Sequence, residues 1–197
     1  MAALHFQSYR GAGISAVYEP LARLRIAVFR AWPYLYEGTM DYEMDYLHTY
    51  AKSPRSFLFA VFDGAEMIGA TTCIPLEAET EAVREPFVEA GYDLGAICYF
   101  GESILLPQYR GLGLGHRFFE EREAHARSFG TFQHTCFCGV VRPDDHPARP
   151  SGYRPLDEFW KKRGYLPVPG LQSQFEWLDI GESAPTRKPM QYWMRLL

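Results

Sequence analysis

The sequence predicts a mixed α/β fold in which strands and helices alternate within one domain, residues 1–197. The first observation behind this prediction is the length, because 197 residues fit one domain of ordinary size better than two. The second is the composition: 47% hydrophobic and 22% charged residues are typical of a globular chain. The third is an early β-hairpin set between segments with helical periodicity.

Two helices are expected after a short opening strand over residues 3–10. Apolar side chains recur every three or four residues from Ser15 to Phe29, which is the spacing of an amphipathic helix. Trp32-Pro33 ends this helix. A second helix is expected from Met40 to Lys52. Its tyrosines fall on one face, namely Tyr42, Tyr46 and Tyr50.

The hairpin follows these helices. Residues 57–62 are rich in aromatic and branched side chains, and Asp63-Gly64 turns the chain into a second strand over 67–74. The acidic stretch 77–90 is expected to form an exposed helix or loop. The next strand spans 97–106 and ends at Pro107, which cannot donate to a sheet.

The second half of the chain is expected to complete the fold. A helix is predicted over 112–129, with an apolar face and Gly130 as its stop. The remaining predicted elements are a strand (132–141), a proline-rich loop (142–155), a short helix (156–163) and two closing strands (175–180 and 191–196).

The charge of the chain limits its partners. The formal net charge of −4 argues against a basic nucleic-acid binder, so no nucleic-acid partner is expected. Residues 1–100 carry 7 Lys and Arg against 13 Asp and Glu, whereas residues 101–197 carry 13 against 11. An anionic ligand is therefore favoured on the second half, and a cationic ligand on the first.

Neither a membrane association nor a metal is expected. No apolar run approaches the ~18–20 residues of a membrane span, and no secretory signal is recognised. The four cysteines are expected to be reduced thiols in a cytoplasmic protein. His134, Cys136 and Cys138 alternate along one strand, but neighbours about 6.6 Å apart do not converge easily on one ion, so core packing is favoured.

The strongest motif is the glycine-rich turn from Leu105 to His116, which reads Leu-Leu-Pro-Gln-Tyr-Arg-Gly-Leu-Gly-Leu-Gly-His. Each glycine inside a helix costs about 1 kcal/mol relative to alanine, so three at a helix start indicate another purpose. The first N–H groups of a helix have no internal acceptor, and the helix dipole adds partial positive charge. The turn therefore predicts a phosphate or pyrophosphate site.

Of three phosphate-binding patterns, two do not fit this turn. The lysine of a P-loop is missing, and the third glycine of a dinucleotide fingerprint is replaced by His116. Gln108, Gly111 and Gly113 match the remaining pattern, Gln/Arg-x-x-Gly-x-Gly/Ala. The turn thus resembles the coenzyme A pyrophosphate loop of the GNAT superfamily of N-acyltransferases. Weaker similarity covers most of the chain, including a late helix ending in Gly164-Tyr165.

The resemblance implies a mostly antiparallel mixed sheet flanked by helices, and direct transfer of an acetyl group from acetyl-CoA to an amine in a ternary complex. It implies a catalytic role for the backbone around Leu105, which contacts the pantetheine and donates to the thioester carbonyl. The residues carried over as cofactor-binding are Leu105, Leu106, Gln108, Arg110, Gly111, Leu112, Gly113, Leu114, Gly115 and His116.

Glu102 is the candidate catalytic base. It is the only acidic residue in the predicted strand 97–106, at a place where the family often carries an acidic residue facing the acceptor. Apolar neighbours should desolvate its carboxylate, which suits a proton acceptor. In a regular strand the side chains of Glu102 and Leu105 point to opposite faces of the sheet. A β-bulge between them is needed to bring both side chains to the same face. The alternatives are an outward-facing glutamate, or one that holds a cationic substrate while water relays the proton.

The leaving group has no obvious acid. Many family members place a tyrosine five residues before the late Gly-Phe or Gly-Tyr aromatic, and this sequence has Trp160 there. Its indole N–H donates a hydrogen bond but is not a usable acid. Tyr153, Tyr165 and Tyr99 are the candidate substitutes, and a thiolate also leaves unassisted, though more slowly.

The acceptor is expected between the first helices and the later strands. The candidate substrate-binding residues are Trp32, Tyr34, Glu37 and Tyr99. Carboxylates mixed with aromatic rings suit an ammonium group through ion pairing and cation–π contact. The alternative is that the tyrosines of the second helix pack on the core while its acidic residues face solvent.

These residues together predict an N-acetyltransferase acting on a small-molecule amine. A protein lysine or N-terminal amine is the alternative within the same class. A non-catalytic acyl-CoA-binding regulatory module is the alternative from another class, suggested by Trp160 at the usual tyrosine position. The sequence is also compatible with a homodimer.

Overall fold

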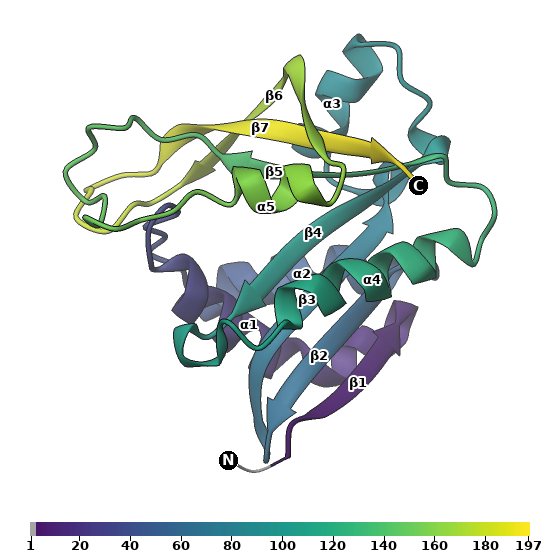
Figure 1. Cartoon of the computed structure of the whole chain (residues 1–197), viewed down its shortest axis with the longest axis horizontal. Coiled ribbons are helices and arrows are strands. Elements are labelled where there is room, and N and C mark those ends of the chain that lie inside the picture. The colour runs from purple at the N-terminus through teal and green to yellow at the C-terminus, as the bar shows by residue number, and fades with distance from the viewer. Residues whose placement is uncertain (1–2) are drawn as a thin grey trace.

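Seven β-strands form one sheet in the order β1-β2-β3-β4-β5-β7-β6, and helices cover its two faces (Figure 1). The computed structural model describes residues 3–197. Neighbouring strands run antiparallel except β4 and β5, which run parallel, so the predicted mixed and mostly antiparallel sheet is confirmed. The strands are β1 (His5–Arg10), β2 (Phe57–Asp63), β3 (Glu66–Pro75), β4 (Ile97–Leu105), β5 (His134–Val140), β6 (Leu166–Trp177) and β7 (Thr186–Leu196).

The helices lie on opposite faces of the sheet. Helix α1 (Tyr18–Phe29) packs on β3 and β4, with α2 (Met40–Lys52) against it. Helix α4 (Leu114–Arg127) packs on the other face, in front of β2 to β4 in Figure 1. The remaining helical elements are α3 (Glu81–Glu89), α5 (Asp157–Lys162) and the 3₁₀ segments η1 (Gly11–Val17), η2 (Leu76–Ala78), η3 (Leu94–Ala96) and η4 (Pro107–Tyr109).

Each face of the sheet carries its own apolar core. On the α1 side the core includes Leu21, Leu47 and Tyr50, all inaccessible to solvent. On the α4 side it is built of aromatic rings, with Phe118 and Phe100 among them. From Ile97 to Phe100, and again at Ile104 and Leu105, successive residues of β4 alternate between the two cores, because strand side chains point alternately to opposite faces. Any residue of β4 is therefore directed either toward α1 or toward α4.

Two helices begin later than the periodicity predicts. Helix α1 begins at Tyr18 rather than Ser15, because the ring of Pro20 in a longer α-helix would clash with the carbonyl of Ala16. The preceding residues form the 3₁₀ segment η1 instead. Helix α4 begins at Leu114 because Gly113 has the left-handed φ of 79° and precedes it as the N-cap.

The closing strands are longer than predicted. Strand β6 begins at Leu166 rather than at 175, and β7 begins at Thr186 rather than at 191. Prolines and Gly170 hide the strand pattern in β6, and a break in register between Pro167 and Gln172 accommodates them. This arrangement is tolerated because β6 is the edge strand of the sheet. Residues 178–180, predicted as strand, lie beyond its end.

The acidic segment 77–90 is only partly exposed. It contributes to η2 and forms α3, and the side chain of Phe87 in α3 is fully buried. The ring of Phe87 packs edge-on against Tyr192 of β7 at 4.7 Å. Within residues 3–197, no helix is long and apolar enough to span a lipid bilayer. The same residues bring together no cluster of His, Cys, Asp and Glu fit to hold a metal ion.

Candidate active site

Strands β4 and β5 separate shortly after they meet. They pair only from Ile97–His134 to Tyr99–Cys136, after which β4 follows β3 and β5 follows β7. Beyond Tyr99, the edge of β4 that faces β5 has no strand partner among the described residues. Backbone N–H and C=O groups need partners, so this unpaired edge is suited to hold an extended ligand.

The glycine-rich turn lies at the end of that edge. Gly111 and Gly113 have φ values of 81° and 79°, a conformation that glycine adopts without strain. Within residues 3–197, the amides from Gly111 to Gly115 donate to no acceptor, and residues 110–113 are exposed. The amide of Arg110 is different, because it donates to the carbonyl of Pro107 at 3.2 Å. Open amides at a helix start fit a diphosphate.

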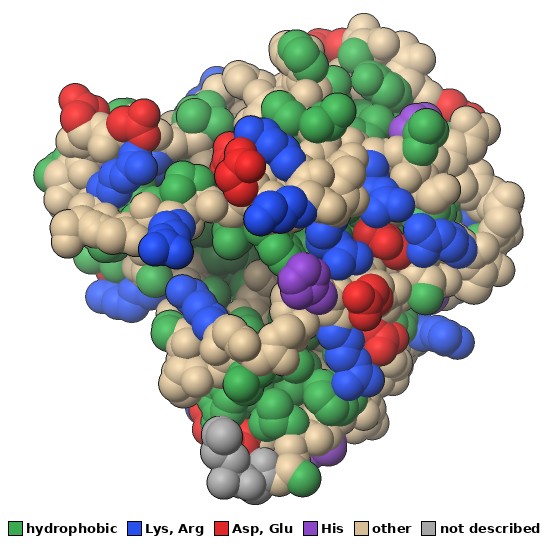
Figure 2. Space-filling model, viewed as in Figure 1, with side chains coloured by type: hydrophobic (Ala, Val, Ile, Leu, Met, Phe, Trp, Pro, Cys, Tyr) green, Lys and Arg blue, Asp and Glu red, His purple; other side chains and the backbone are tan. Residues whose placement is uncertain are grey.

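Basic side chains surround this turn. Figure 2 shows Lys and Arg gathered on the face that carries α4 and α5, beside a hollow in the surface. Arg110, Lys161 and Lys162 are exposed there. The imidazole of His116 lies against Arg163 at 3.3 Å, while its amide donates to the Gly113 carbonyl. The surroundings therefore favour an anion.

Trp160 is a packing residue on this side of the sheet. Its ring lies 5.0 Å from both Phe137 and Trp193, and a side chain at Gly139 would meet it. Tyr165 is fully buried and bonds to Thr135 at 2.7 Å, which removes it from any ligand. Of the tyrosines considered as an acid, Tyr99 alone lines the cavity described next.

A cavity of about 370 Å³ lies on the α1 side of β4. It is lined by aromatic residues of several elements together with charged groups. Those that matter here are Arg25, Tyr34, Tyr46, Tyr99, Glu102 and Trp177. Three of the residues predicted from sequence meet in this cavity, namely Tyr34, Tyr99 and Glu102. A site of this size suits a small molecule.

Two predicted residues lie elsewhere. The ring of Trp32 packs against His146 at 4.9 Å and against Tyr153 at 5.9 Å. Glu37 is exposed and pairs with Arg30 at 2.6 Å. Neither of them lines the cavity, although both belong to the segment that carries Tyr34.

A β-bulge turns Glu102 toward the cavity. Thr71 pairs with Ser103 and Cys73 with Phe100, so Thr72 alone faces both Gly101 and Glu102. This extra residue places Glu102 on the face of Tyr99 and Ile104, toward α1. It does not place Glu102 on the face of Leu105, which packs with the other core.

The Glu102 carboxylate is 2% exposed and fully bonded. Arg25 of α1 donates to one oxygen and Thr72 donates to the other. Arg25 also pairs with the buried Glu43 of α2, so it links two carboxylates. The arginine stabilises the ionised form of Glu102 against the cost of burial.

The backbone of the bulge is held from the opposite side. The Glu102 carbonyl accepts from Thr71 Oγ1 at 2.7 Å and from Arg122 Nη1 at 3.2 Å. Arg122 is 1% exposed and lies on the rings of Phe100 and Phe119. Burial lowers the pKa of Arg122 to about 10. Arg122 therefore acts as a positioning residue for the bulge.

Arg142 holds the backbone of the segment that brings Tyr34 to the cavity. The guanidinium of Arg142 donates to the carbonyls of Pro33 and Tyr34 at 2.8 and 2.7 Å. It also forms a two-pronged pair with Asp179 at 2.6 and 2.9 Å, and Arg142 is the main cause of the lowered pKa of that carboxyl. The clamp fixes the segment after α1 against the end of β6.

The sequence reasoning missed Arg25 and Glu79. Arg25 follows Leu21 by four residues and precedes Val28 by three, so it lies on the apolar face of its helix. A charged residue on an apolar face was the available signal. Glu79, which is 4% exposed, follows η2 and carries no periodic signal.

Residues 23–165 match the model of the acetyltransferase (GNAT) family. Because this match spans more than half of the chain, the protein belongs to that family, whose members use acyl-CoA donors. It is therefore an acyl-CoA-dependent N-acetyltransferase acting on an amine acceptor. Among curated proteins, none matches the sequence.

Solved acetyltransferases share the fold. An acetyltransferase of Thermus thermophilus is similar with a TM-score of 0.56 and 14% identity, over 100% of both chains. NAA60 of Arabidopsis thaliana, solved in complex with a bisubstrate analogue, is similar with a TM-score of 0.60 and 13% identity over 98% of both chains. An acetyltransferase of Streptococcus agalactiae is similar with a TM-score of 0.60 and 14% identity over 100% of both chains. At these identities, the likeness concerns the fold.

Proposed function

We propose that the protein transfers an acetyl group from acetyl-CoA to a small-molecule amine. The observation that carries the proposal is the cavity beside the unpaired edge of β4, which combines aromatic side chains with the carboxylate of Glu102. A primary amine is free base in about one molecule in 10³ at pH 7, so its acetylation benefits from a nearby proton acceptor.

Acetyl-CoA, when bound, supplies a thioester carbonyl carbon for the amine to attack. The open amides of Gly111 to Gly115 are suited to its diphosphate, and Gln108, Leu112 and His116 are exposed beside them. In the proposal, the β4 backbone at Leu105 holds the pantetheine arm and donates to the thioester carbonyl. The amide of Leu106 cannot share this role, because it donates to the Ile68 carbonyl at 2.9 Å. Arg110 contributes its side-chain charge, since its amide is already bonded.

Glu102 accepts the proton in the proposed reaction. The amine nitrogen bonds to the acetyl carbon, the carbon–sulfur bond breaks toward sulfur, and one amine proton passes to the carboxylate. Tyr99 lies beside the reacting groups with its hydroxyl 3.2 Å from Cys138 Sγ. Burial raises the pKa of Tyr99, so its hydroxyl stays protonated and available as a donor.

The proposed acceptor is a compact cation with an apolar body. Tyr34, Tyr99 and Trp177 supply aromatic surface for the body of such a molecule. Glu176 supplies negative charge in the same cavity, in which Glu102 is paired with Arg25. A protein lysine or N-terminal amine is the second candidate. Peptides therefore belong in any acceptor screen.

Binding and turnover test the proposal together. Acetyl-CoA is expected to raise the Tm, and thiol release is expected with small aromatic or apolar amines rather than with peptides. Faster release with peptides would replace the small-molecule acceptor by a protein. A raised Tm without release on any acceptor would favour a regulatory module, which Trp160 at the usual tyrosine position suggests.

The substitution Glu102→Gln tests the base. We expect kcat/KM to fall by about 10²-fold at pH 7, the lower end of general-base effects, and the deficit to shrink as the pH nears the amine pKa. Glu43→Gln is the matched control, because Glu43 pairs with the same arginine but does not line the cavity. Its pH profile should keep the wild-type shape. An unchanged profile for Glu102→Gln would remove Glu102 as the base.

A further inference from the structure

We infer that Arg122 contributes its positive charge to the reaction: held behind β4, it stabilises the negative charge that forms on the thioester oxygen during acetyl transfer. This inference rests on the proposed function and goes beyond the part that Arg122 plays in holding the bulge. Because Arg122 is buried behind the strand, it acts through the backbone of β4 and is a positioning residue.

Arg122 is a buried cation whose hydrogen-bond acceptors are uncharged. It is 1% exposed, and its Nε and Nη1 donate to the carbonyls of Phe118 and Glu102, each at 3.2 Å. Its Nη2 has no partner within residues 3–197. The adjacent Glu123 pairs with other arginines, among them Arg195 at 3.4 Å. With a pKa of about 10, Arg122 keeps its charge at pH 7. Burying a charge without a bonded countercharge is costly, so this charge indicates an electrostatic use.

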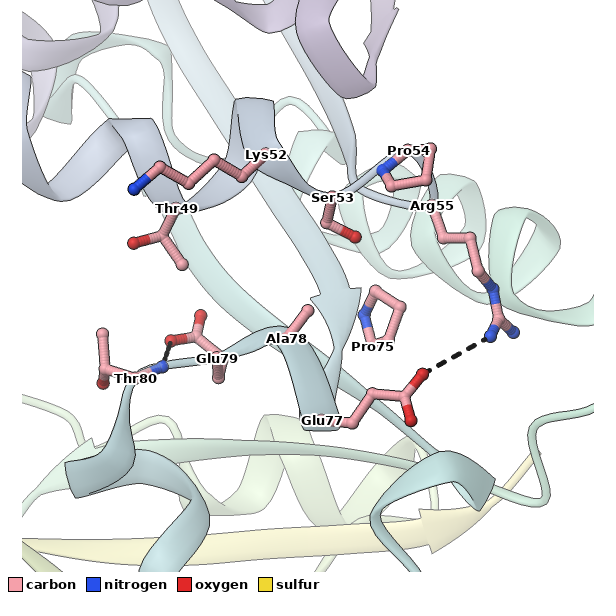
Figure 3. Close-up of a pocket in the computed structure, with 10 residues that line it drawn as sticks. All are labelled: Thr49, Lys52, Ser53, Pro54, Arg55, Pro75, Glu77, Ala78, Glu79 and Thr80. Carbon is pink, nitrogen blue, oxygen red and sulfur yellow. Dashed lines mark hydrogen bonds and ion pairs between the residues drawn. The ribbon is translucent and has the colours of Figure 1, made fainter.

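Two other arginines in similar surroundings are bonded to carboxylates. The guanidinium groups of Arg25, Arg55 and Arg122 all lie over aromatic rings, at 4.2 to 5.1 Å from the ring centroids. Arg25 pairs with Glu102. Arg55 pairs with Glu77 at 3.9 Å, beside a second cavity of about 520 Å³ (Figure 3). A bonded carboxylate cancels much of the field of an arginine, and Arg122 has no such partner among the described residues.

The N–H groups of β4 alternate between β3 and the open edge. The Leu106 amide donates to the Ile68 carbonyl of β3 at 2.9 Å, and the pairing stays in this register back to Ser103. In an antiparallel pair, successive residues bond alternately toward the neighbouring strand and away from it. The N–H group of Ile104 therefore also faces β3. Those of Ser103 and Leu105 face the edge of β4 that has no strand partner within the described chain.

One peptide group joins Arg122 to this open edge. The Glu102 carbonyl and the Ser103 N–H belong to the same trans peptide, so they point in opposite directions. The carbonyl points away from the open edge and accepts from Arg122 Nη1 at 3.2 Å and from Thr71 Oγ1 at 2.7 Å. A charged donor on the carbonyl polarises the peptide, which makes its N–H a stronger donor. The charge of Arg122 therefore acts at the open edge.

This charge matters most while the thioester oxygen is negative. As the amine nitrogen bonds to the acetyl carbon, the π electrons of the carbonyl move onto its oxygen, and they return when the carbon–sulfur bond breaks. The N–H groups of the open edge are suited to stabilise this oxygen. Ser103 N–H, which Arg122 strengthens, is the next donor along the edge from that of Leu105, on the side of Glu102. Positive charge in a dry interior acts more strongly than in water.

The substitution Arg122→Gln removes the charge and keeps a hydrogen-bond donor. We expect kcat to fall by about 10-fold or more, whereas KM for acetyl-CoA should change by less than about threefold, because only the transition state carries the negative oxygen. Arg55→Gln is the matched control, since Arg55 also lies over aromatic rings but lines the second cavity and not the acceptor cavity. It should keep the wild-type kcat.

Infrared spectroscopy of bound acetyl-CoA, labelled with ¹³C at the thioester carbonyl, reports the polarisation without turnover. The labelled carbonyl band should move to lower wavenumber on binding to the wild type, and by less on binding to Arg122→Gln. Thr71→Val removes the uncharged donor from the same Glu102 carbonyl and keeps the side-chain shape. Its band should also move less than that of the wild type, and this variant carries the test if Arg122→Gln does not fold.

Three results would overturn the inference while acetyl transfer stands. They are a wild-type kcat in Arg122→Gln, a wild-type infrared shift in Arg122→Gln or in Thr71→Val, and an equal loss of kcat in Arg55→Gln. A wild type that binds no acetyl-CoA, or that is inactive on every amine, removes the proposed function as well.

Discussion

At the scale of single residues, the buried carboxylates Glu102 and Glu79 differ in their partners. Glu102 is bonded by Arg25 and Thr72, whereas Glu79 accepts one backbone N–H at 2.9 Å. A cation bonded to a carboxylate favours its charged form, and burial without such a bond disfavours it. The same residue type is therefore held in an ion pair at Glu102, whereas burial raises the pKa of Glu79 to about 7.

The glycines of the turn act through their backbone. A side chain at Gly113 would meet nothing within 4 Å, so the residue is needed for its φ of 79° and for access to the amides. Gly91 is a matched position, since its φ is 77° and its surroundings are equally open. It lies in the turn after α3, away from the glycine-rich turn.

We predict that Gly113→Ala and Gly91→Ala each destabilise the protein by about 1–2 kcal/mol, the cost of the left-handed conformation for alanine. Only Gly113→Ala should weaken acetyl-CoA binding, by about tenfold or more, because the substitution disturbs the amides that face the diphosphate. Calorimetric titration and urea unfolding measure the two effects. Equal acetyl-CoA affinities for both variants would contradict this role of the turn.

At the scale of elements, the bulge in β4 decides the chemistry of the site. Without the extra residue, Glu102 would point toward α4 and away from the cavity. Gly101 makes the bulge compatible with α2, because a Cβ there would lie 1.8 Å from the Tyr50 hydroxyl and 2.8 Å from Thr72 Oγ1. The bulge, Tyr50 and Thr72 thus fit together only with glycine at this position.

Gly101→Ala is accordingly predicted to destabilise the protein by about 1–3 kcal/mol, as overpacking in a core does. Adding Tyr50→Phe removes the atom nearest to the new methyl group, so it should restore part of that loss. Tyr50→Phe alone should not stabilise the protein. Urea unfolding of the two single variants and the double variant gives the coupling, and strictly additive effects would contradict this packing.

At the scale of the whole molecule, Glu79 links stability to pH. Its pKa is raised from 4.5 to about 7 in the folded protein, so between these values the folded state binds more protons than the unfolded state. Stability contributed by protonated Glu79 is therefore complete below about pH 4.5 and is lost as the pH rises through about 7.

Glu79→Gln should remove this dependence. We expect the free energy of unfolding of the wild type, relative to the variant, to fall by roughly 3 kcal/mol between pH 5 and pH 8. Other groups titrate alike in both proteins, so the difference isolates Glu79. Urea unfolding at both pH values measures it, and a difference that does not change with pH would refute the assignment.

Local sequence patterns determined much of the fold. The hairpin of β2 and β3 was predicted from residue type and Asp63-Gly64, and α2 from the periodicity between Met40 and Lys52. The turn from Leu105 to His116 was found the same way, because a phosphate loop is built from consecutive amides. Such features depend on neighbours in the chain, which the sequence displays directly.

The acceptor cavity depended on contacts between distant residues. Arg25 meets Glu102 across 77 positions, and Arg142 holds Tyr34 across 108. Whether Glu102 faces the cavity was decided by a one-residue bulge that periodicity does not reveal. The sequence by itself thus determined the glycine-rich turn and the order of elements. Only the tertiary structure decided which carboxylates, tyrosines and arginines meet, because their burial and pairing arise when separate elements pack together.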